Sequence, residues 1–189
     1  MKILKNFQPY QLNGLLCEYV PIAIFQGRSE AGPRALGNRS IIFNASMVSG
    51  RRYINKIKKR EFWRPFAGTI MFEHVHDWFD IKRLEESPFM SYAVQVKEDK
   101  APFIPAILHK DNTCRIQTLK REQNPNFYKI IEEFYEGGKN PPIIGNTSFN
   151  LAGKPLVETF EDAIETLENS ELEFLYLPET SELIYVENK

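Results

Sequence analysis

Apolar residues fall into short runs separated by polar stretches, and this pattern predicts a sheet with helices packed on it. Continuous apolar runs of this length are typical of buried strands. We expect strands at 22–25, 41–43, 66–72, 92–96, 104–108, 142–144, 174–177 and 183–186. Pro102 and Pro105 place the 104–108 segment at a sheet edge, because proline cannot donate a ladder hydrogen bond.

Helical spacing is clearest at 124–136, where Asn124 can cap the helix and Pro125 fits its first position. A second helix is expected at 160–168 with Thr159 as its cap. The segment 51–62 fits a helix with its cations outward, and 11–17 is partly helical. Strands and helices interleave without a repeat or a linker. We therefore predict one domain, 1–189, of the α/β (α+β mixed) class, with a twisted mixed sheet flanked by helices.

Composition narrows the class of protein. A net charge of −1 over 189 residues disfavours a general nucleic-acid binder. Cys17 and Cys114 do not form a disulfide framework, so a reducing compartment is expected, and Cys114 is interpreted as a packing residue. No run reaches membrane-spanning length. We expect a cytoplasmic protein. His74 and His76 lack a third ligand, so no metal site is predicted.

Charge is distributed unevenly along the chain. The segment 51–64 carries seven cations and one acid, whereas 155–189 carries ten acids and one lysine. The acidic end is interpreted as a solvated surface. The basic segment contains Lys58, Arg60 and Arg64 beside Trp63 and Phe66, which are typical of packed structure. It therefore predicts an anion site, and a solvated basic face is the alternative.

Three further segments supply groups suited to phosphate. Polar side chains follow the strand at 142–144, and they need partners if buried: Asn146, Thr147, Ser148 and Asn150. The glycine-rich segment 27–40 carries Arg28, Arg34 and Arg39, whose planar forks match phosphate. The alternative is a surface loop in which these arginines pair with acids such as Glu30. Neither a GxxxxGK[ST] nor a GxGxxG pattern is present.

The last segment is 109–117. Asp111-Asn112 predicts a tight turn, and Arg115 and Gln117 alternate on one face of the strand that follows. His109, Arg115 and Gln117 are thus expected to border the same pocket, with a polar hairpin as the alternative. His109 by itself is more typical of a structural hydrogen-bonding residue.

Taken in order, these segments resemble the C-terminal domain of the carbamoyltransferase family, which includes nodulation-factor and antibiotic O-carbamoyltransferases. The matching stretches are Gly27 to Ser40, Asn55 to Ala67, His109 to Thr118 and Asn146 to Val157. The resemblance runs from about residue 11 to the end. Gly68 stands where the family usually has proline, and Asn112 where it usually has glycine.

The resemblance implies a YrdC-like fold that uses carbamoyl phosphate and ATP to form carbamoyl-adenylate and pyrophosphate, with Mg²⁺ bound through the phosphates. Lys58, Arg64, Arg115 and Ser148 are the implied catalytic residues. The implied substrate- and ATP-binding residues are Arg28, Arg34, Arg39, Arg60, His109, Gln117, Asn146, Thr147 and Asn150. Ser148, Asn146 and Asn150 are expected to hold carbamoyl or phosphate oxygens.

Family members normally carry a larger N-terminal domain with an actin-like ATPase fold, which transfers the carbamoyl group. Met1 lies almost where the C-terminal domain would begin, so we expect a fragment or a separately encoded transferase partner. Two alternatives stay open. One is a non-catalytic module that binds a nucleotide or carbamoyl phosphate. The other is a threonylcarbamoyl-adenylate synthase-like activity. The acceptor is not determined by these residues.

Overall fold

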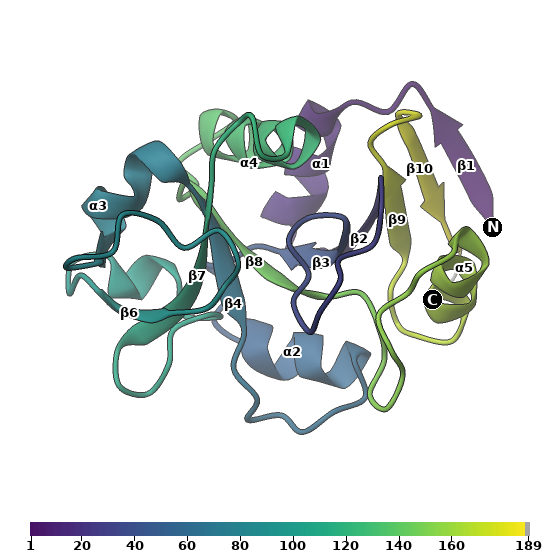
Figure 1. Cartoon of the computed structure of the whole chain (residues 1–189). Helices are drawn as coiled ribbons and strands as arrows, with labels where there is room; N and C mark the ends of the chain where they lie inside the picture. The colour runs from purple at the N-terminus through teal and green to yellow at the C-terminus, as the bar shows by residue number, and fades with distance from the viewer. Residues whose placement is uncertain (188–189) are drawn as a thin grey trace.

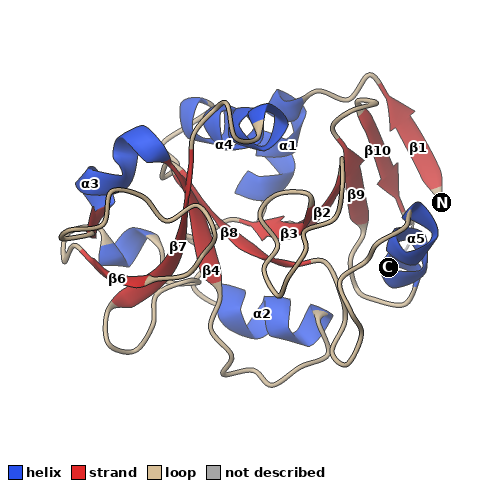
Figure 2. Ribbon diagram, in the orientation of Figure 1, coloured by secondary structure: helices blue, strands red, loops and turns tan. Residues whose placement is uncertain are grey.

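One ten-stranded mixed sheet runs through the computed structural model, which describes residues 1–187. Its strand order is β1-β10-β9-β2-β3-β8-β4-β7-β6-β5. The strands are β1 (Lys2–Lys5), β2 (Ile22–Phe25), β3 (Arg39–Phe43), β4 (Ala67–Met71), β5 (Phe79–Asp80), β6 (Ala93–Val96), β7 (Thr113–Leu119), β8 (Ile143–Ser148), β9 (Phe174–Leu177) and β10 (Glu182–Tyr185). Figure 2 shows the strands in red between the helices.

Helices cover both faces of this sheet (Figure 1). The α-helices are α1 (Pro9–Cys17), α2 (Gly50–Ile57), α3 (Val75–Trp78), α4 (Pro125–Glu136) and α5 (Phe160–Glu168). Strand β2 shows why two layers form, because its alternate side chains enter different cores. Ile22 and Ile24 pack with residues of α1 and α4, whereas Ala23 packs with residues of α2 and α5.

Strand directions confirm the mixed class predicted from the sequence. The β2–β9 and β4–β7 pairs are parallel, and the other neighbouring pairs are antiparallel. The caps of the two best-signalled helices are also confirmed. The Asn124 side chain accepts a hydrogen bond from the Phe127 N–H, and Thr159 and Asp162 form a capping box.

The edge strand predicted at 104–108 is wrong. A 3₁₀ helix (Ala101–Phe103) and turns occupy this region, and the backbone N–H groups of Ile107 and Leu108 both donate to the Ile104 carbonyl. Pro102 and Pro105 remove the donors that a strand would need. The apolar pattern reflects burial instead, since Ile104 and Ile107 are fully buried in the core.

Two boundaries also differ from the prediction. Helix α2 ends at Ile57 rather than at residue 62, because Lys59 adopts a left-handed conformation with φ 54°. Strand β8 continues to Ser148, so the polar run lies within the strand. The strands β1 and β5 are not predicted from the sequence, because neither contains a continuous apolar run.

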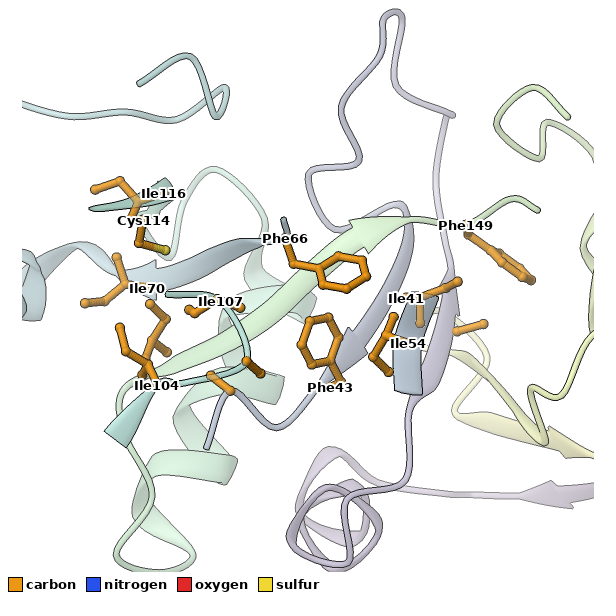
Figure 3. Close-up of a cluster of buried hydrophobic side chains, with 14 of the residues drawn as sticks. Ile41, Phe43, Ile54, Phe66, Ile70, Ile104, Ile107, Cys114, Ile116 and Phe149 are labelled. Carbon is orange, nitrogen blue, oxygen red and sulfur yellow. The ribbon is translucent and has the colours of Figure 1, made fainter. Parts of the chain in front are cut away.

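An aromatic pair joins the core to the polar surface of the sheet. Phe43 on β3 packs edge-to-face against Phe66, which precedes β4, with ring centroids 5.3 Å apart (Figure 3). Gly145 on β8 makes room for the Phe43 ring, because a Cβ built there would lie 2.2 Å from it. Phe66 is therefore buried by packing against Phe43 directly before β4 begins.

Candidate functional site

A polar cavity of about 140 Å³ lies beside the adjacent strands β7, β4 and β8. The strand register creates it, because Ala67 on β4 pairs with Arg115 on β7 and with Asn146 on β8. The small Ala67 side chain leaves space between the two longer ones. Six predicted site residues line the cavity: Arg34, Arg60, Arg115, Asn146, Thr147 and Ser148.

The three arginines of this pocket have no carboxylate partner. Among residues 1–187, none of the salt bridges involves Arg34, Arg60 or Arg115. Burial, and then the Arg34 charge, lowers the pKa of Arg115. Burial, and then the Arg64 charge, lowers the pKa of Arg60 to about 10. Glu61 offsets part of this effect on Arg60. Clustered cations destabilise one another, and a bound anion would relieve that repulsion.

Arg60 is held in place from two sides. Its Nε donates to Asn55 Oδ1 at 2.5 Å, and its guanidinium lies 4.6 Å from the centroid of the Phe66 ring. Asn55 is buried on α2 and also donates to the carbonyls of Phe62 and Arg64. The two terminal nitrogens of Arg60 are thus preorganised without being consumed by these contacts.

Lys58 lies behind the pocket rather than in its lining. Its Nζ donates to the Ser148 carbonyl, to Ser148 Oγ at 3.2 Å and to Asn150 Oδ1 at 3.0 Å. Ser148 Oγ donates in turn to Asn150 Oδ1 at 2.7 Å. An ammonium has three donors, and all three are used here. The geometry therefore gives Lys58 the task of positioning Ser148, not of contacting a ligand directly.

Lys58 predicts a pH dependence of stability. Burial, and then the Arg60 charge, lowers its pKa well below the ordinary 10.5. Between these two values the unfolded chain binds a proton that the folded chain lacks, so the free energy of unfolding rises with pH. Lys58→Met removes the titrating group, and with it the part of the pH dependence of the unfolding free energy that comes from Lys58. We expect the unfolding free energy of the variant minus that of the wild type to fall as the pH rises toward 10.5, in urea unfolding measured at each pH.

The exposed Lys56 on the same helix supplies the matched control. Lys56→Met should change the unfolding free energy by a similar amount at every pH in that range. Parallel profiles for Lys58→Met and the wild type would show that burial of this ammonium does not govern stability.

The glycine-rich segment 27–40 is organised by Glu30, but not by pairing with arginines. Its carboxylate accepts from the backbone N–H groups of Leu36 at 2.6 Å, Asn38 at 2.9 Å and Arg39 at 3.2 Å. Among residues 1–187 no salt bridge joins Glu30 to these arginines, although the Glu30 charge raises the pKa of Arg39 against the larger effect of burial. Glu30 is occupied by the backbone, and Arg34 lines the pocket without a salt bridge to any residue of 1–187.

The terminal nitrogens of Arg39, which is predicted to bind ligand, contact the backbone in this structure. Its Nη1 donates to the carbonyls of Gln26 and Asn38, and its Nη2 donates to those of Gly27 and Glu158. The guanidinium also lies 3.6 Å from the centroid of the Phe25 ring, and its pKa is lowered by burial. All four terminal hydrogens are consumed, so Arg39 ties loops together and offers none of them to a phosphate.

A buried amide network supports the pocket from below. Gln117 Nε2 donates to the Leu36 carbonyl at 3.0 Å, and Thr69 Oγ1 donates to Gln117 Oε1 at 2.8 Å. Asn146 Nδ2 lies within hydrogen-bond distance of three acceptors: the Ala35 carbonyl, Thr69 Oγ1 and Gln117 Oε1. The expectation that Asn146 holds substrate oxygens needs correction, because its amide hydrogens are already used.

Three predicted residues do not line the pocket. Arg28 is exposed, and Arg64 pairs with Glu61 at 2.8 Å on the surface. His109 Nδ1 contacts Thr113 Oγ1 at 3.0 Å, and burial lowers the pKa of His109. The contact with Thr113 fits the polar-hairpin alternative, although the Arg115 charge also lowers the pKa of His109 and so lies near it.

Several pocket residues were not identified as site residues from the sequence. Phe66, Ala67 and Met90 line the cavity, and Thr69 links its supporting amides. Met90 comes from the segment between β5 and β6 and adopts φ 54°. Nothing in the local sequence marks Met90. Ala67 and Thr69 would require knowledge of the strand register.

Residues 1–187 contain neither a cluster of metal ligands nor a helix able to span a membrane. No group of three or more His, Cys, Asp or Glu side chains is arranged to hold a metal ion. Within the same residues, no helix combines the length and apolar character needed to cross a membrane.

The chain matches a protein family and several known proteins. The family described as "Carbamoyltransferase C-terminus" matches residues 14–182. "Nodulation protein NolO" of Bradyrhizobium diazoefficiens is 41% identical over 152 residues, which cover 79% of this chain and 28% of that protein. "3'-hydroxymethylcephem-O-carbamoyltransferase" of Streptomyces clavuligerus is 31% identical over 163 residues, covering 84% and 30%. The chain thus spans less than a third of the length of these two relatives.

A solved structure confirms the fold. Full-length HypF "in the phosphate- and nucleotide-bound form" superposes with a TM-score of 0.61 at 17% identity, covering 97% of this chain and 22% of HypF. At this identity the likeness shows the fold alone. It agrees with the YrdC-like α/β class predicted from the sequence.

Proposed function

Because this chain belongs to the carbamoyltransferase family as its C-terminal domain, we propose that it forms carbamoyl-adenylate from carbamoyl phosphate and ATP. This would be the first half of an O-carbamoyl transfer. The observation that carries the proposal is the cavity of about 140 Å³, whose three arginines form no salt bridge among residues 1–187. Ligand pockets for drug-sized molecules are typically about 300–1,000 Å³, so this one suits a phosphorylated group the size of carbamoyl phosphate. The nucleoside of ATP would then lie outside it.

The reaction brings several anions together, and the pocket arginines would offset their repulsion. A carbamate oxygen attacks the α-phosphorus of ATP, a new P–O bond forms, and the bond to the β-phosphate oxygen breaks to release pyrophosphate. Carbamate and phosphate come from carbamoyl phosphate and one water. Arg34, Arg60 and Arg115 would stabilise the charge that develops on the phosphoryl oxygens. Lys58 and Asn150 would fix Ser148 beside them, so that positioning contributes much of the rate.

The side chains of the pocket fit a metal ion that is bound by the substrate phosphates rather than by protein ligands. No carboxylate from the described residues lines the pocket. Mg²⁺ often binds through substrate phosphates and keeps several waters, so cations and amides around it are compatible with this mode. When bound, Mg²⁺ would neutralise part of the triphosphate charge.

The transfer step needs an acceptor site, which we propose is supplied by another domain or subunit of the N-terminal carbamoyltransferase type. Support comes from the relatives, in which the matched region covers only 28% and 30% of the protein. Mixing this protein with a candidate partner and an acceptor should then give a carbamoylated product. A partner that carries the acceptor site but gives no product would contradict the arrangement.

The adenylate step is tested by release of pyrophosphate from ATP and Mg²⁺. We expect release that depends on carbamoyl phosphate, with one phosphate formed per pyrophosphate. Arg60→Met should abolish most of it, whereas Arg83→Met, which alters an exposed arginine outside the pocket, should not. Tight ATP binding without turnover would instead favour a binding module. Release that requires threonine and bicarbonate would favour threonylcarbamoyl-adenylate synthesis.

A further inference from the structure

We propose that Asn146 recognises the amide of the carbamoyl group through its Oδ1, and that the backbone of segment 27–40 fixes the direction in which that oxygen points. The inference rests on the proposed function, since it takes carbamoyl phosphate as the ligand. It adds a specificity-determining residue that selects a carbamoyl group over an acyl group of the same size.

The orientation of Gln117 is the first step. Its Nε2 lies 3.0 Å from the Leu36 carbonyl, which can only accept a hydrogen bond. The nitrogen must therefore face Leu36, and Oε1 must face Thr69 and Asn146. The contact of 2.8 Å from Thr69 Oγ1 to Gln117 Oε1 agrees with this assignment.

The orientation of Asn146 follows from its neighbours. Its terminal amide lies 3.3 Å from the Ala35 carbonyl and 3.3 Å from Gln117 Oε1, and both are acceptors. A flipped amide would bring oxygen against oxygen at both contacts. Nδ2 therefore points into the network, and Oδ1 points the other way.

Asn146 Oδ1 is buried and has no hydrogen-bond partner among the described residues. The whole residue is 1% exposed, yet it belongs to the lining of the arginine pocket. An unsatisfied buried acceptor costs about 1–3 kcal/mol. An unpartnered buried acceptor can accept a hydrogen bond from a ligand. Because Asn146 lines the pocket, a ligand bound there would supply the donor.

Carbamoyl phosphate has one kind of N–H donor, the amide of its carbamoyl group. Its phosphate oxygens are acceptors when ionised, so they would be repelled by Asn146 Oδ1 and attracted by the arginines. The ligand would then bind with its amide toward β8 and its phosphate toward Arg34, Arg60 and Arg115. Acetyl phosphate has a methyl group in place of that amide and would leave Oδ1 unpaired.

The test is calorimetric titration of the whole chain with carbamoyl phosphate, acetyl phosphate and inorganic phosphate. The wild type should bind carbamoyl phosphate about 5- to 150-fold more tightly than acetyl phosphate, the factor that corresponds to about 1–3 kcal/mol. Asn146→Leu should bring this ratio close to one while acetyl phosphate still binds. Asn44→Leu removes a buried amide outside the pocket and should keep the wild-type ratio.

A second variant covers the case in which Asn146→Leu does not fold. Gln117→Met removes one of the acceptors that orient Asn146, and it should lower the ratio without abolishing phosphate binding. Equal wild-type affinities for carbamoyl and acetyl phosphate would overturn this inference and leave the anion site intact. If none of the three ligands binds, the proposed function fails as well.

Discussion

Arg115→Met is expected to weaken carbamoyl phosphate binding by about 10- to 150-fold and to leave the free energy of unfolding unchanged or slightly raised. A charge-assisted hydrogen bond contributes about 1.5–3 kcal/mol, which sets the size of the loss. Stability should not fall, because Arg115 forms no salt bridge among residues 1–187 and the Arg34 charge lowers its pKa. Removing one of two mutually repelling cations relieves repulsion in the folded state. Calorimetric titration and urea unfolding measure the two effects separately.

Arg83→Met is the matched control for this change, because it removes an exposed arginine by the same substitution. Its affinity for carbamoyl phosphate should equal that of the wild type. If Arg115→Met bound the ligand normally, the pocket would not be the anion site. If it lost stability by several kcal/mol, Arg115 would have a structural role that its contacts do not show.

Arg39→Met should have the opposite profile, with a loss of about 3–5 kcal/mol in the free energy of unfolding. That cost is typical of removing one partner from a buried charged network. Arg39 is 3% exposed and donates to four backbone carbonyls from three segments of the chain. Methionine fills part of the volume over the Phe25 ring but leaves these carbonyls without their donor. Urea unfolding of the variant measures the loss.

Arg34→Met provides the comparison within the same segment, since Arg34 lies on the exposed rim of the pocket and forms no salt bridge among residues 1–187. It should weaken carbamoyl phosphate binding with little change in stability. The two arginines are thus expected to separate binding from folding. An Arg39→Met protein as stable as the wild type would show that the four carbonyls find other partners and that the loops do not depend on this guanidinium.

Two arginines of one motif are expected to have different roles, one in ligand binding and the other in folding. Arg34 and Arg39 stand five positions apart in a segment where both were expected to bind phosphate. Glu30 decides the difference, because its carboxylate gathers three backbone N–H groups and folds the segment into a compact loop. Arg39 begins β3 and is buried under that loop, whereas Arg34 extends from it toward β7.

Gly68 has a packing role in this fold. It lies on β4 between β7 and β8, and a Cβ built there would come within 2.6 Å of Ile107 and 2.7 Å of Ile143. Glycine allows these side chains to meet over the strand. Glycine in place of the family's usual proline therefore affects core packing. Gly68 does not line the pocket beside Ala67.

The sequence by itself determined the elements and the chemical character of the site. Apolar runs predicted most of the strands, and the capping residues Asn124 and Thr159 predicted the start of two helices, because these signals act within a few residues. The ordered motifs also indicated the family and a cationic site for phosphorylated ligands.

Only the tertiary structure decided which cations enter that site. The register that sets Ala67 between Arg115 and Asn146 comes from pairing three strands far apart in the chain. The left-handed turn at Lys59 ends α2 and directs Lys58 behind Ser148 while Arg60 stacks on Phe66. The direction of a side chain depends on such long-range contacts, and local residue patterns do not encode them.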